Sequence, residues 1–140
     1  MIVYAESSAV LAWLLGEAEG KPVRRLLADA ERVVSSTLTP LECARSLARG
    51  VASGRLKDGD DLIARRLLDD ATRGWALLEM SGTVLDRAAR RFPTEPVRTR
   101  DALHLAAAAV FDEALSGVVM ITLDERIRAN AAAMGLKVAP

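Results

Sequence analysis

The chain is predicted to form a three-layer α/β/α fold around a central parallel sheet of four or five short strands. Two observations predict this fold: short apolar runs that lack polar alternation, and segments of helical pattern between them. Uninterrupted apolar runs are typical of strands covered on both faces. Strands that alternate with helices favour a parallel sheet with helices on each side.

Each predicted strand is an apolar run of three or four residues. Four runs fit this description: Ile2–Ala5, Val33–Ser35, Trp75–Leu78 and Val118–Ile121. Lys137–Ala139 is a candidate for a short fifth strand. These runs are too short for buried helices, and helical patterns separate them.

Seven helices are predicted between these strands. Ser7 or Ser8 can cap the first helix, which ends near Gly16. The third is predicted to begin at Thr39-Pro40, because proline is favoured in the first turn. The remaining helices are predicted at about Lys21–Ala30, Asp58–Thr72, Thr83–Arg91, Thr99–Leu115 and Asp124–Met134, with the third closed by Ser53-Gly54. Two helices thus separate the second strand from the third, where a simple crossover needs one. A helical hairpin that partly projects from the sheet is one solution.

Composition limits the possible classes of protein. The 140 residues are predicted to form one domain, 1–140, and 51% apolar with 27% charged residues is a globular composition. The aromatic content of 4% argues against stacking platforms for single-stranded nucleic acid. A net charge of zero means that any contact with nucleic acid must use a local patch.

The predicted location is the cytoplasm, with no membrane contact. Cys43 is the only cysteine, which favours a reducing compartment. The apolar start of the chain lacks a basic flank and runs directly into Glu6, unlike a signal peptide. No apolar run approaches the ~20 residues that a membrane span needs.

Four acidic residues are predicted to meet at one edge of the sheet. Glu6 directly follows the first strand, and Glu42 lies in the first turn of the helix after the second. Asp101 begins the helix that leads into the fourth strand, and Asp124 follows that strand. All four positions belong to the carboxyl edge, where ligands of parallel sheets bind. Clustered carboxylates need a neutralising cation, and hard divalent ions prefer oxygen ligands.

Helix capping is the alternative explanation for these acids. Acidic residues suit the first turn of any helix because of the helix dipole. Asp124 fits an N-cap, and Thr39 with Glu42 fits a capping box in which Glu42 reaches back to the Thr39 amide. Glu6 is harder to explain this way, since it interrupts an apolar junction where no cap is required. The convergence of all four favours a functional site.

The segments around the acids resemble PIN-domain ribonucleases. Val3–Ala9 is similar to the opening strand and acidic turn of that family, and Leu41–Leu47 to its second acidic helix. Arg98–Ala106 contains a very close match to the Asp-Ala-Leu-His-Leu-Ala segment, and Ile121–Arg126 matches the closing block. The resemblance covers essentially the whole chain. In size it looks most like the VapC toxins of toxin–antitoxin pairs.

This resemblance implies a PIN-like fold and an endoribonuclease dependent on Mg²⁺ or Mn²⁺, with one or two ions. It implies that Glu6, Glu42, Asp101 and Asp124 are the catalytic and metal-binding carboxylates. Ser8 and Thr122 would then be supporting hydroxyls. The implied partners are an RNA substrate, a cognate antitoxin and a second copy of the chain in a homodimer. The family's first acid is most often Asp, so Glu6 extends the carboxylate by one methylene and bears on metal preference.

Arginines close to the acids are candidates for RNA binding. Arg98 and Arg100 precede Asp101, and Arg45 follows Glu42 by one turn. They are either a solvated surface or a rim that contacts phosphates. Further arginines of this kind are Arg49, Arg87, Arg90 and Arg91.

His104 is expected to be a packed, hydrogen-bonded residue rather than a catalyst. Cys43 is expected to be a small core residue rather than a nucleophile. One histidine and one cysteine are too few for a zinc site with nitrogen and sulfur ligands.

Two other classes of function compete with a nuclease. A catalytically weakened RNA- or protein-binding module of the same fold is one, and Glu6 is its main support. A phosphoacceptor regulator also gathers acids at this edge. It would need paired acids after the first strand and a lysine after the last long strand, where this chain has Ser7-Ser8 and Thr122. A purely structural protein does not account for four converging acids.

Overall fold

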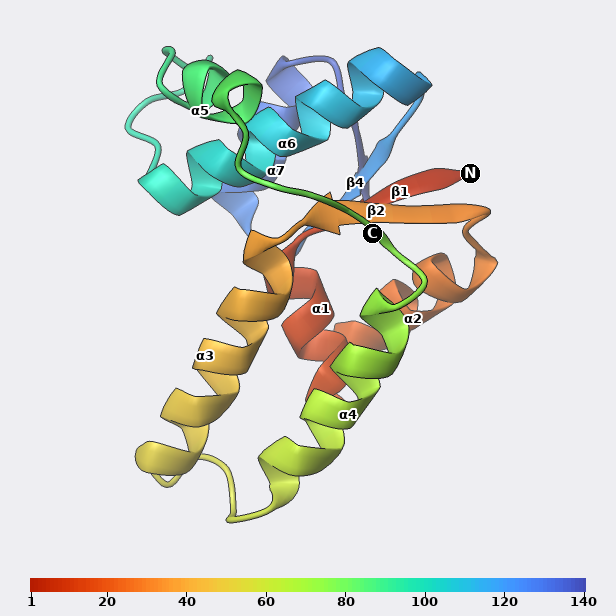
Figure 1. Cartoon of the computed structure of the whole chain (residues 1–140), viewed down its shortest axis with the longest axis vertical. Coiled ribbons are helices and arrows are strands. Elements are labelled where there is room, and N and C mark those ends of the chain that lie inside the picture. Colours follow the sequence, from red (N-terminus) through yellow and green to blue (C-terminus); the bar gives the residue numbers. More distant parts are fainter.

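Five parallel strands form the sheet in the computed structural model, which describes residues 1–140. The strand order is β3-β2-β1-β4-β5, so the first strand lies in the middle (Figure 1). The strands are β1 Ile2–Ala5, β2 Arg32–Ser36, β3 Ala76–Leu78, β4 Val119–Ile121 and β5 Lys137–Ala139. The predicted parallel sheet and the candidate fifth strand are therefore confirmed.

Seven helices connect the strands. They are α1 Ser7–Leu14, α2 Gly20–Asp29, α3 Leu38–Ala52, α4 Asp60–Thr72, α5 Gly82–Ala88, α6 Thr99–Leu115 and α7 Glu125–Ala133. The predicted helices are all present, with ends that differ by a few residues. The fifth stops at Ala88 rather than Arg91, and the seventh begins one residue after Asp124.

The two faces of the sheet carry separate hydrophobic clusters. Tyr4 and Met120 pack with α5, α6 and α7 on one face, whereas Val3, Ala5 and Ile121 pack with the first four helices on the other. Successive strand residues point to opposite faces, so each apolar run supplies both clusters. The structure thus has the predicted three layers, with α5–α7 above the sheet and α1–α4 below it in Figure 1.

The outer strands are less buried than the apolar runs predicted. Ala76 of β3 is exposed, and the other residues of β3 are only half-buried. Trp75, predicted as the start of this strand, lies just before it and packs partly against the lower cluster. An edge strand has a neighbour on one side only, so its residues remain closer to solvent than those of β1.

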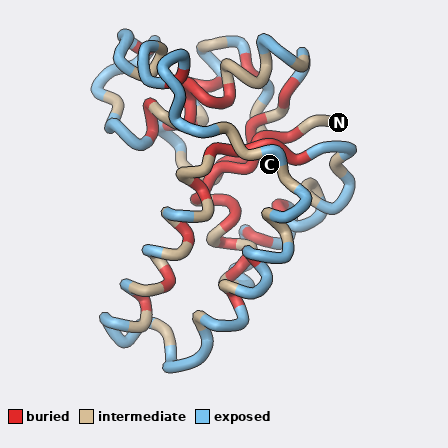
Figure 2. The backbone as a smooth tube through the Cα atoms, viewed as in Figure 1, coloured by how far each residue is buried: buried red, intermediate tan, exposed pale blue.

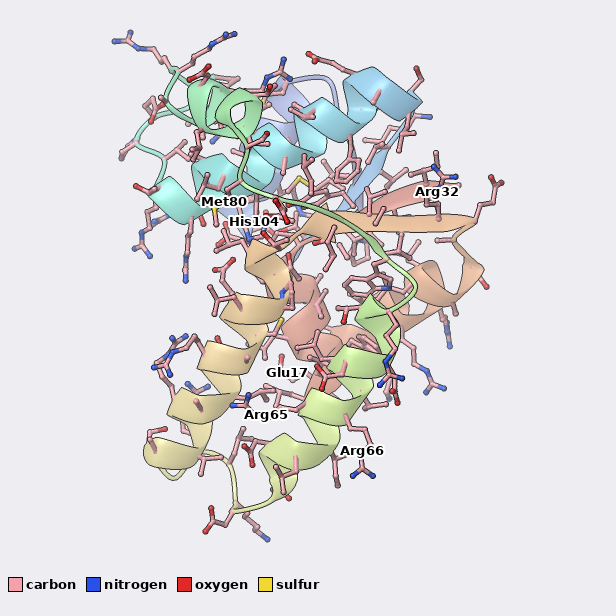
Figure 3. The ribbon with its side chains drawn as sticks, in the orientation of Figure 1. Glu17, Arg32, Arg65, Arg66, Met80 and His104 are labelled. Carbon is pink, nitrogen blue, oxygen red and sulfur yellow. The ribbon has the colours of Figure 1, made fainter.

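Helices α3 and α4 form the projecting hairpin that the long connection between β2 and β3 suggested. Figure 2 shows buried residues along the sheet and exposed residues at the tip of the hairpin. Arg65 of α4 reaches across to α3, where its Nη2 donates to the Ala44 carbonyl at 3.1 Å (Figure 3). The same side chain pairs with Asp61 one turn earlier. The hairpin is thus held by polar contacts in addition to apolar packing.

Helices α1 and α2 approach each other very closely at Gly20. A Cβ atom at this position would lie 2.4 Å from the backbone oxygen of Ala12. Only glycine allows this approach without a shift of the backbone. None of the seven helices combines the length and apolar character required of a membrane span.

Candidate active site

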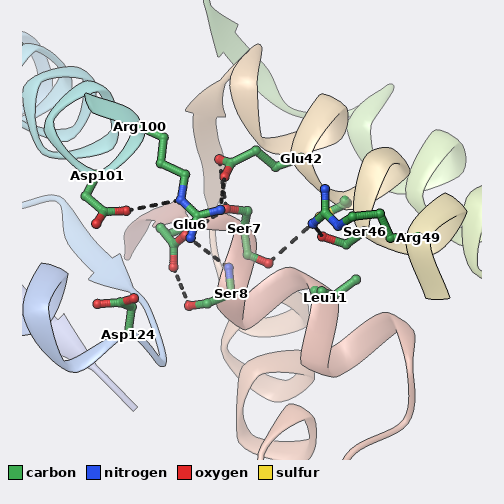
Figure 4. Close-up of a pocket in the computed structure, with 11 residues that line it drawn as sticks. Glu6, Ser7, Ser8, Leu11, Glu42, Ser46, Arg49, Arg100, Asp101 and Asp124 are labelled. Atoms are coloured by element: carbon green, nitrogen blue, oxygen red, sulfur yellow. Dashed lines mark hydrogen bonds and ion pairs between the residues drawn. The ribbon is translucent and has the colours of Figure 1, made fainter. Parts of the chain in front are cut away.

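All four predicted acids line one pocket at the carboxyl edge of the sheet. The pocket has a volume of about 260 Å³, and Figure 4 shows Glu6, Glu42, Asp101 and Asp124 around it. Its other lining residues are Ser7, Ser8, Leu11, Cys43, Ser46, Arg49 and Arg100. The predicted convergence of residues from four separate elements is therefore present in the structure.

The local structure around each acid explains how the acids reach this edge. The Glu6 amide continues the sheet ladder by donating to the Ile121 carbonyl at 3.0 Å. Asp101 lies in the first turn of α6, as predicted. Glu42 lies beyond the first turn of α3, because that helix begins at Leu38 rather than Thr39. Asp124 is the residue that caps α7.

Glu6 is buried and is surrounded by hydrogen-bond donors. Its Oε1 accepts from the Ser7 hydroxyl at 2.7 Å and from the Ser8 amide at 3.0 Å. Its Oε2 accepts from the Thr122 hydroxyl at 2.8 Å and from the Ser8 hydroxyl. Glu6 is therefore the N-cap of α1 in place of the predicted Ser7 or Ser8, and the expectation that no cap is required of Glu6 was wrong. Ser8 and Thr122, the predicted supporting hydroxyls, both contact its carboxylate.

Glu42 forms no capping box with Thr39. The Thr39 hydroxyl instead contacts the Ala5 carbonyl, and the Glu42 carboxylate faces the pocket. Its Oε1 lies 2.5 Å from His104 Nε2 and 3.0 Å from the Ser7 hydroxyl, whose single hydrogen is shared between Glu6 and Glu42. Burial raises the pKa of Glu42, but the His104 contacts, Ser7 and Arg100 outweigh it and lower the pKa overall. Glu42 is therefore ionised at neutral pH.

His104 is buried and links Glu42 to the centre of the sheet. Its Nδ1 lies 2.9 Å from the hydroxyl of Tyr4 on β1. Burial and the charge of Glu6 raise the pKa of Tyr4, so this hydroxyl keeps its proton. A carboxylate only accepts hydrogen bonds, so His104 must carry a hydrogen on Nε2. The expectation of a packed, hydrogen-bonded histidine is confirmed. Its contact with Glu42 was not predicted from the sequence.

Asp101 and Asp124 retain oxygen atoms without hydrogen-bond partners. Asp124 Oδ1 accepts from the amides of Arg126 and Ile127 at 2.9 and 3.0 Å, so the capping alternative is correct for this residue. Its second oxygen makes no hydrogen bond, and neither does the carboxylate of Asp101. The pKa of Asp101 is raised, first by burial and then by the negative charge of Asp124. The positive charge of Arg100 lowers this pKa by a smaller amount. The two aspartates thus repel each other.

The residue types in the pocket suit a hard cation, but their side chains are not yet arranged to hold one. No three His, Cys, Asp or Glu side chains are grouped closely enough to hold one metal ion. Glu6 faces its four donors, and one Asp124 oxygen caps a helix. The atoms that remain free to bind a metal are nevertheless carboxylate oxygens, which suit Mg²⁺ or Mn²⁺. A cation between Asp101 and Asp124 would relieve their repulsion.

Only some of the predicted arginines reach the pocket. Arg100 and Arg49 line it, whereas Arg45 and Arg98 are exposed and lie outside its lining. Arg87 pairs with Glu113 at 2.5 Å, away from the acids. Arg49 lies two turns after Glu42 on α3, and this helical spacing explains its position.

Ser7 and Tyr4 were not predicted as site residues. Ser7 bridges Glu6 and Glu42, but adjacent serines at a helix start give no signal that distinguishes one from the other. Tyr4 lies within an apolar run, and the packing of its ring in the core is enough to explain a tyrosine at this position. Cys43 is fully buried, and burial raises its thiol pKa to about 12, as expected for a core residue rather than a nucleophile.

Comparisons with known proteins agree with this fold. A family model of the PIN domain matches residues 3–133. Ribonuclease VapC46 of Mycobacterium tuberculosis is 35% identical over 136 residues, covering 97% of this chain and 95% of the relative. Ribonuclease VapC45 of the same species is 27% identical over 139 residues, or 99% and 95% of the two chains. The chain therefore belongs to the PIN domain family.

Solved structures of low sequence identity share the fold. FitAB bound to a DNA fragment includes a chain with a TM-score of 0.70 at 17% identity, covering 99% of this chain and 94% of that one. PAE2754 from Pyrobaculum aerophilum has a TM-score of 0.62 at 23% identity, with 98% and 83% covered. VapBC-5 from Mycobacterium tuberculosis, a member of a family of toxin–antitoxin systems, has a TM-score of 0.56 at 19% identity, with 99% and 95% covered.

Proposed function

We propose that this chain is a metal-dependent endoribonuclease and the toxin component of a type II toxin–antitoxin pair. The observation that carries the proposal is the convergence of Glu6, Glu42, Asp101 and Asp124 on one pocket. Support comes from a relative named as a ribonuclease that is 35% identical over 97% of this chain. The proposed cofactor is Mg²⁺ or Mn²⁺, as one or two ions.

The four acids have different proposed roles. A divalent ion bound in such a site lowers the pKa of a coordinated water and offsets negative charge on the phosphate. Asp101 and Asp124 are the proposed direct ligands, because they keep oxygen atoms without hydrogen bonds. Glu42, ionised and held by His104, is the proposed ligand or water-orienting base. Glu6, held by the Ser8 amide and the Thr122 hydroxyl, is the proposed water-mediated ligand and adds fixed negative charge to the site.

The rim of the pocket is suited to the RNA backbone. Arg49 and Arg100 lie at its edge, and guanidinium groups bind phosphate through paired N–H donors. They add local positive charge to a chain whose net charge is zero. Arg45 and Arg98 are proposed to contact RNA further from the scissile phosphate.

Cleavage of total RNA by the purified protein in Mg²⁺ or Mn²⁺ tests this proposal. We expect new RNA ends that are absent with a chelator and absent with Asp101→Asn. Glu113→Gln is a matched control, because it also removes one negative charge from α6 but lies 65% exposed at the other end of that helix. The proposal fails if no RNA is cut and calorimetry detects no Mn²⁺ binding at millimolar concentration.

One observation favours the alternative of a weakened RNA- or protein-binding module. Glu6 already has four hydrogen-bond donors, so its charge is stabilised without a metal. A module of this kind would bind RNA equally with and without divalent ions and would leave it intact. Anisotropy of a labelled single-stranded RNA, measured in Mn²⁺ and in chelator, distinguishes the two functions.

The proposed partners are RNA, a cognate antitoxin and a second copy of the chain. Exposed apolar side chains support a protein partner: Leu62 and Ile63 of α4 are 64% and 69% exposed. Light scattering of the purified chain measures whether it is a homodimer, and co-purification with a candidate antitoxin tests the second partner. A cytoplasmic location and a single domain over 1–140 remain part of the proposal.

A further inference from the structure

Arg100 lies between two of the acids of the pocket. Its Nη1 is 3.6 Å from Glu42 Oε2, and its Nε is 3.6 Å from Asp101 Oδ1. Figure 4 shows the guanidinium between these carboxylates, which belong to different helices. Arg100 precedes Asp101 on α6, and Glu42 projects from α3. One flexible side chain therefore bridges the pocket.

No other arginine or lysine forms an ion pair with any of the four acids. Arg49 lines the same pocket, but its Nη2 donates to the Ser46 hydroxyl at 2.9 Å. Glu6 and Glu42 have His104 beside them, and Asp124 has no cationic partner. Arg100 is thus the one permanently charged cation that offsets the clustered carboxylates.

The contacts of Arg100 are weak enough to be exchanged. Both distances are those of ion pairs without hydrogen bonds, and the side chain is 54% exposed. Exposed pairs of this kind contribute at most about 1 kcal/mol each, or about a factor of five in an equilibrium constant. A divalent ion among the same oxygens would repel the guanidinium and compete for Asp101 and Glu42.

We propose that Arg100 is an internal counter-ion that competes with the divalent metal for the acid cluster and, once displaced, binds a phosphate of the RNA. The inference rests on the proposed metal-dependent function. Arg100 is then a positioning residue with opposite effects on the two ligands. It weakens metal binding to the free protein, and it strengthens binding of the nucleic acid to the loaded protein.

Other features of the pocket agree with an exchange at this point. Asp101 makes no hydrogen bond, so loss of its Arg100 contact leaves it free to ligate. The backbone of Arg100 belongs to the first turn of α6, so its side chain can turn outward without unfolding the helix. The displaced guanidinium would still belong to the pocket lining, where its paired N–H donors could bind a phosphate.

Calorimetric titration of the metal-free protein with Mn²⁺ alone tests the competition. We expect Arg100→Gln to bind Mn²⁺ about two- to tenfold more tightly than the wild-type protein, from the loss of one or two exposed pairs. Arg100→Lys keeps the charge and is expected to remain within about twofold of wild type. Arg49→Gln is the matched control for loss of one rim charge that is not paired with an acid, and it is expected to show a smaller gain than Arg100→Gln.

The outcomes separate this inference from the proposed function. Unchanged or weaker Mn²⁺ binding by Arg100→Gln, beside measurable binding by the wild type, overturns the inference alone. Binding by neither protein overturns both, and binding only by the variant supports the competition. In saturating Mn²⁺ the variant is expected to have a higher KM for RNA with kcat less affected; an unchanged KM overturns the phosphate contact. Circular dichroism confirms folding of each variant.

Discussion

Replacement of His104 by alanine is expected to destabilise the protein strongly, because its side chain is 1% exposed and has polar partners on two sides. Its Nε2 lies 2.5 Å from Glu42, and a hydrogen bond to a charged group contributes about 1.5–3 kcal/mol. The bond to Tyr4 at 2.9 Å adds about 1 kcal/mol. The cavity adds a further cost, since truncation of large buried side chains costs about 2–5 kcal/mol. These contributions overlap, and we expect a total loss of about 3–5 kcal/mol.

Urea denaturation at pH 7 without divalent ions measures this loss, because a bound ion would stabilise the wild type separately. We expect a lower midpoint with an unchanged slope. Tyr4→Phe is the matched variant: it removes the hydroxyl partner but keeps the ring, and about 1 kcal/mol should be lost. The double variant should lose less than the sum, since both changes remove one shared bond. A loss below about 1 kcal/mol for His104→Ala would refute the network.

Three further predictions concern other positions. Gly20→Ala should lower stability by about 1–3 kcal/mol in the same urea assay, because the added Cβ would clash with backbone atoms. Gly82→Ala should be neutral or slightly stabilising, because a Cβ there would have no atom within 4 Å. Cys43 should resist iodoacetamide at pH 8 in the folded protein and react in urea, since burial raises its pKa to about 12; labelling of the native protein at the rate of a free thiol would contradict this. Asp101→Asn should raise the melting temperature of the metal-free protein at pH 7, because the pKa of Asp101 is raised by burial and by Asp124. The gain should disappear as the pH falls below 3.8, where Asp101 is protonated in both folded and unfolded states; a gain that persists there would show that charge is not its cause.

The sheet and its helices could be predicted because the local signals agree with the tertiary structure. Apolar runs such as Ile2–Ala5 coincide with strands, and Gly135 follows the last helix. The exposure of β3 could not be predicted, because an edge position depends on strand order and not on the run itself. The observed ends of α5 also differ from the predicted ones, because no strong capping residue marks its last turn.

The candidate site could be predicted as a set of acids but not as a network. Each acid stands beside a strand end or helix start, and parallel topology brings such positions together. The roles within the cluster depend on side-chain directions that no spacing reveals. Thr39 contacts the Ala5 carbonyl and leaves Glu42 free for His104, for example. The contact between Arg100 and Glu42 likewise joins helices that are distant in sequence.

The position of β1 in the middle of the sheet has a consequence for synthesis of the protein. Glu6 is hydrogen-bonded to Thr122, 116 positions later, and β1 pairs with β4. Synthesis on the ribosome proceeds at about 5–20 residues per second, and β1 is made well before β4. The edge of β1 that pairs with β4 therefore stays open until β4 follows. The pocket is incomplete until Asp124 has left the exit tunnel. Whatever chemistry the pocket performs therefore begins only after Asp124 has been synthesised, because a chain that stops before this residue lacks part of the pocket.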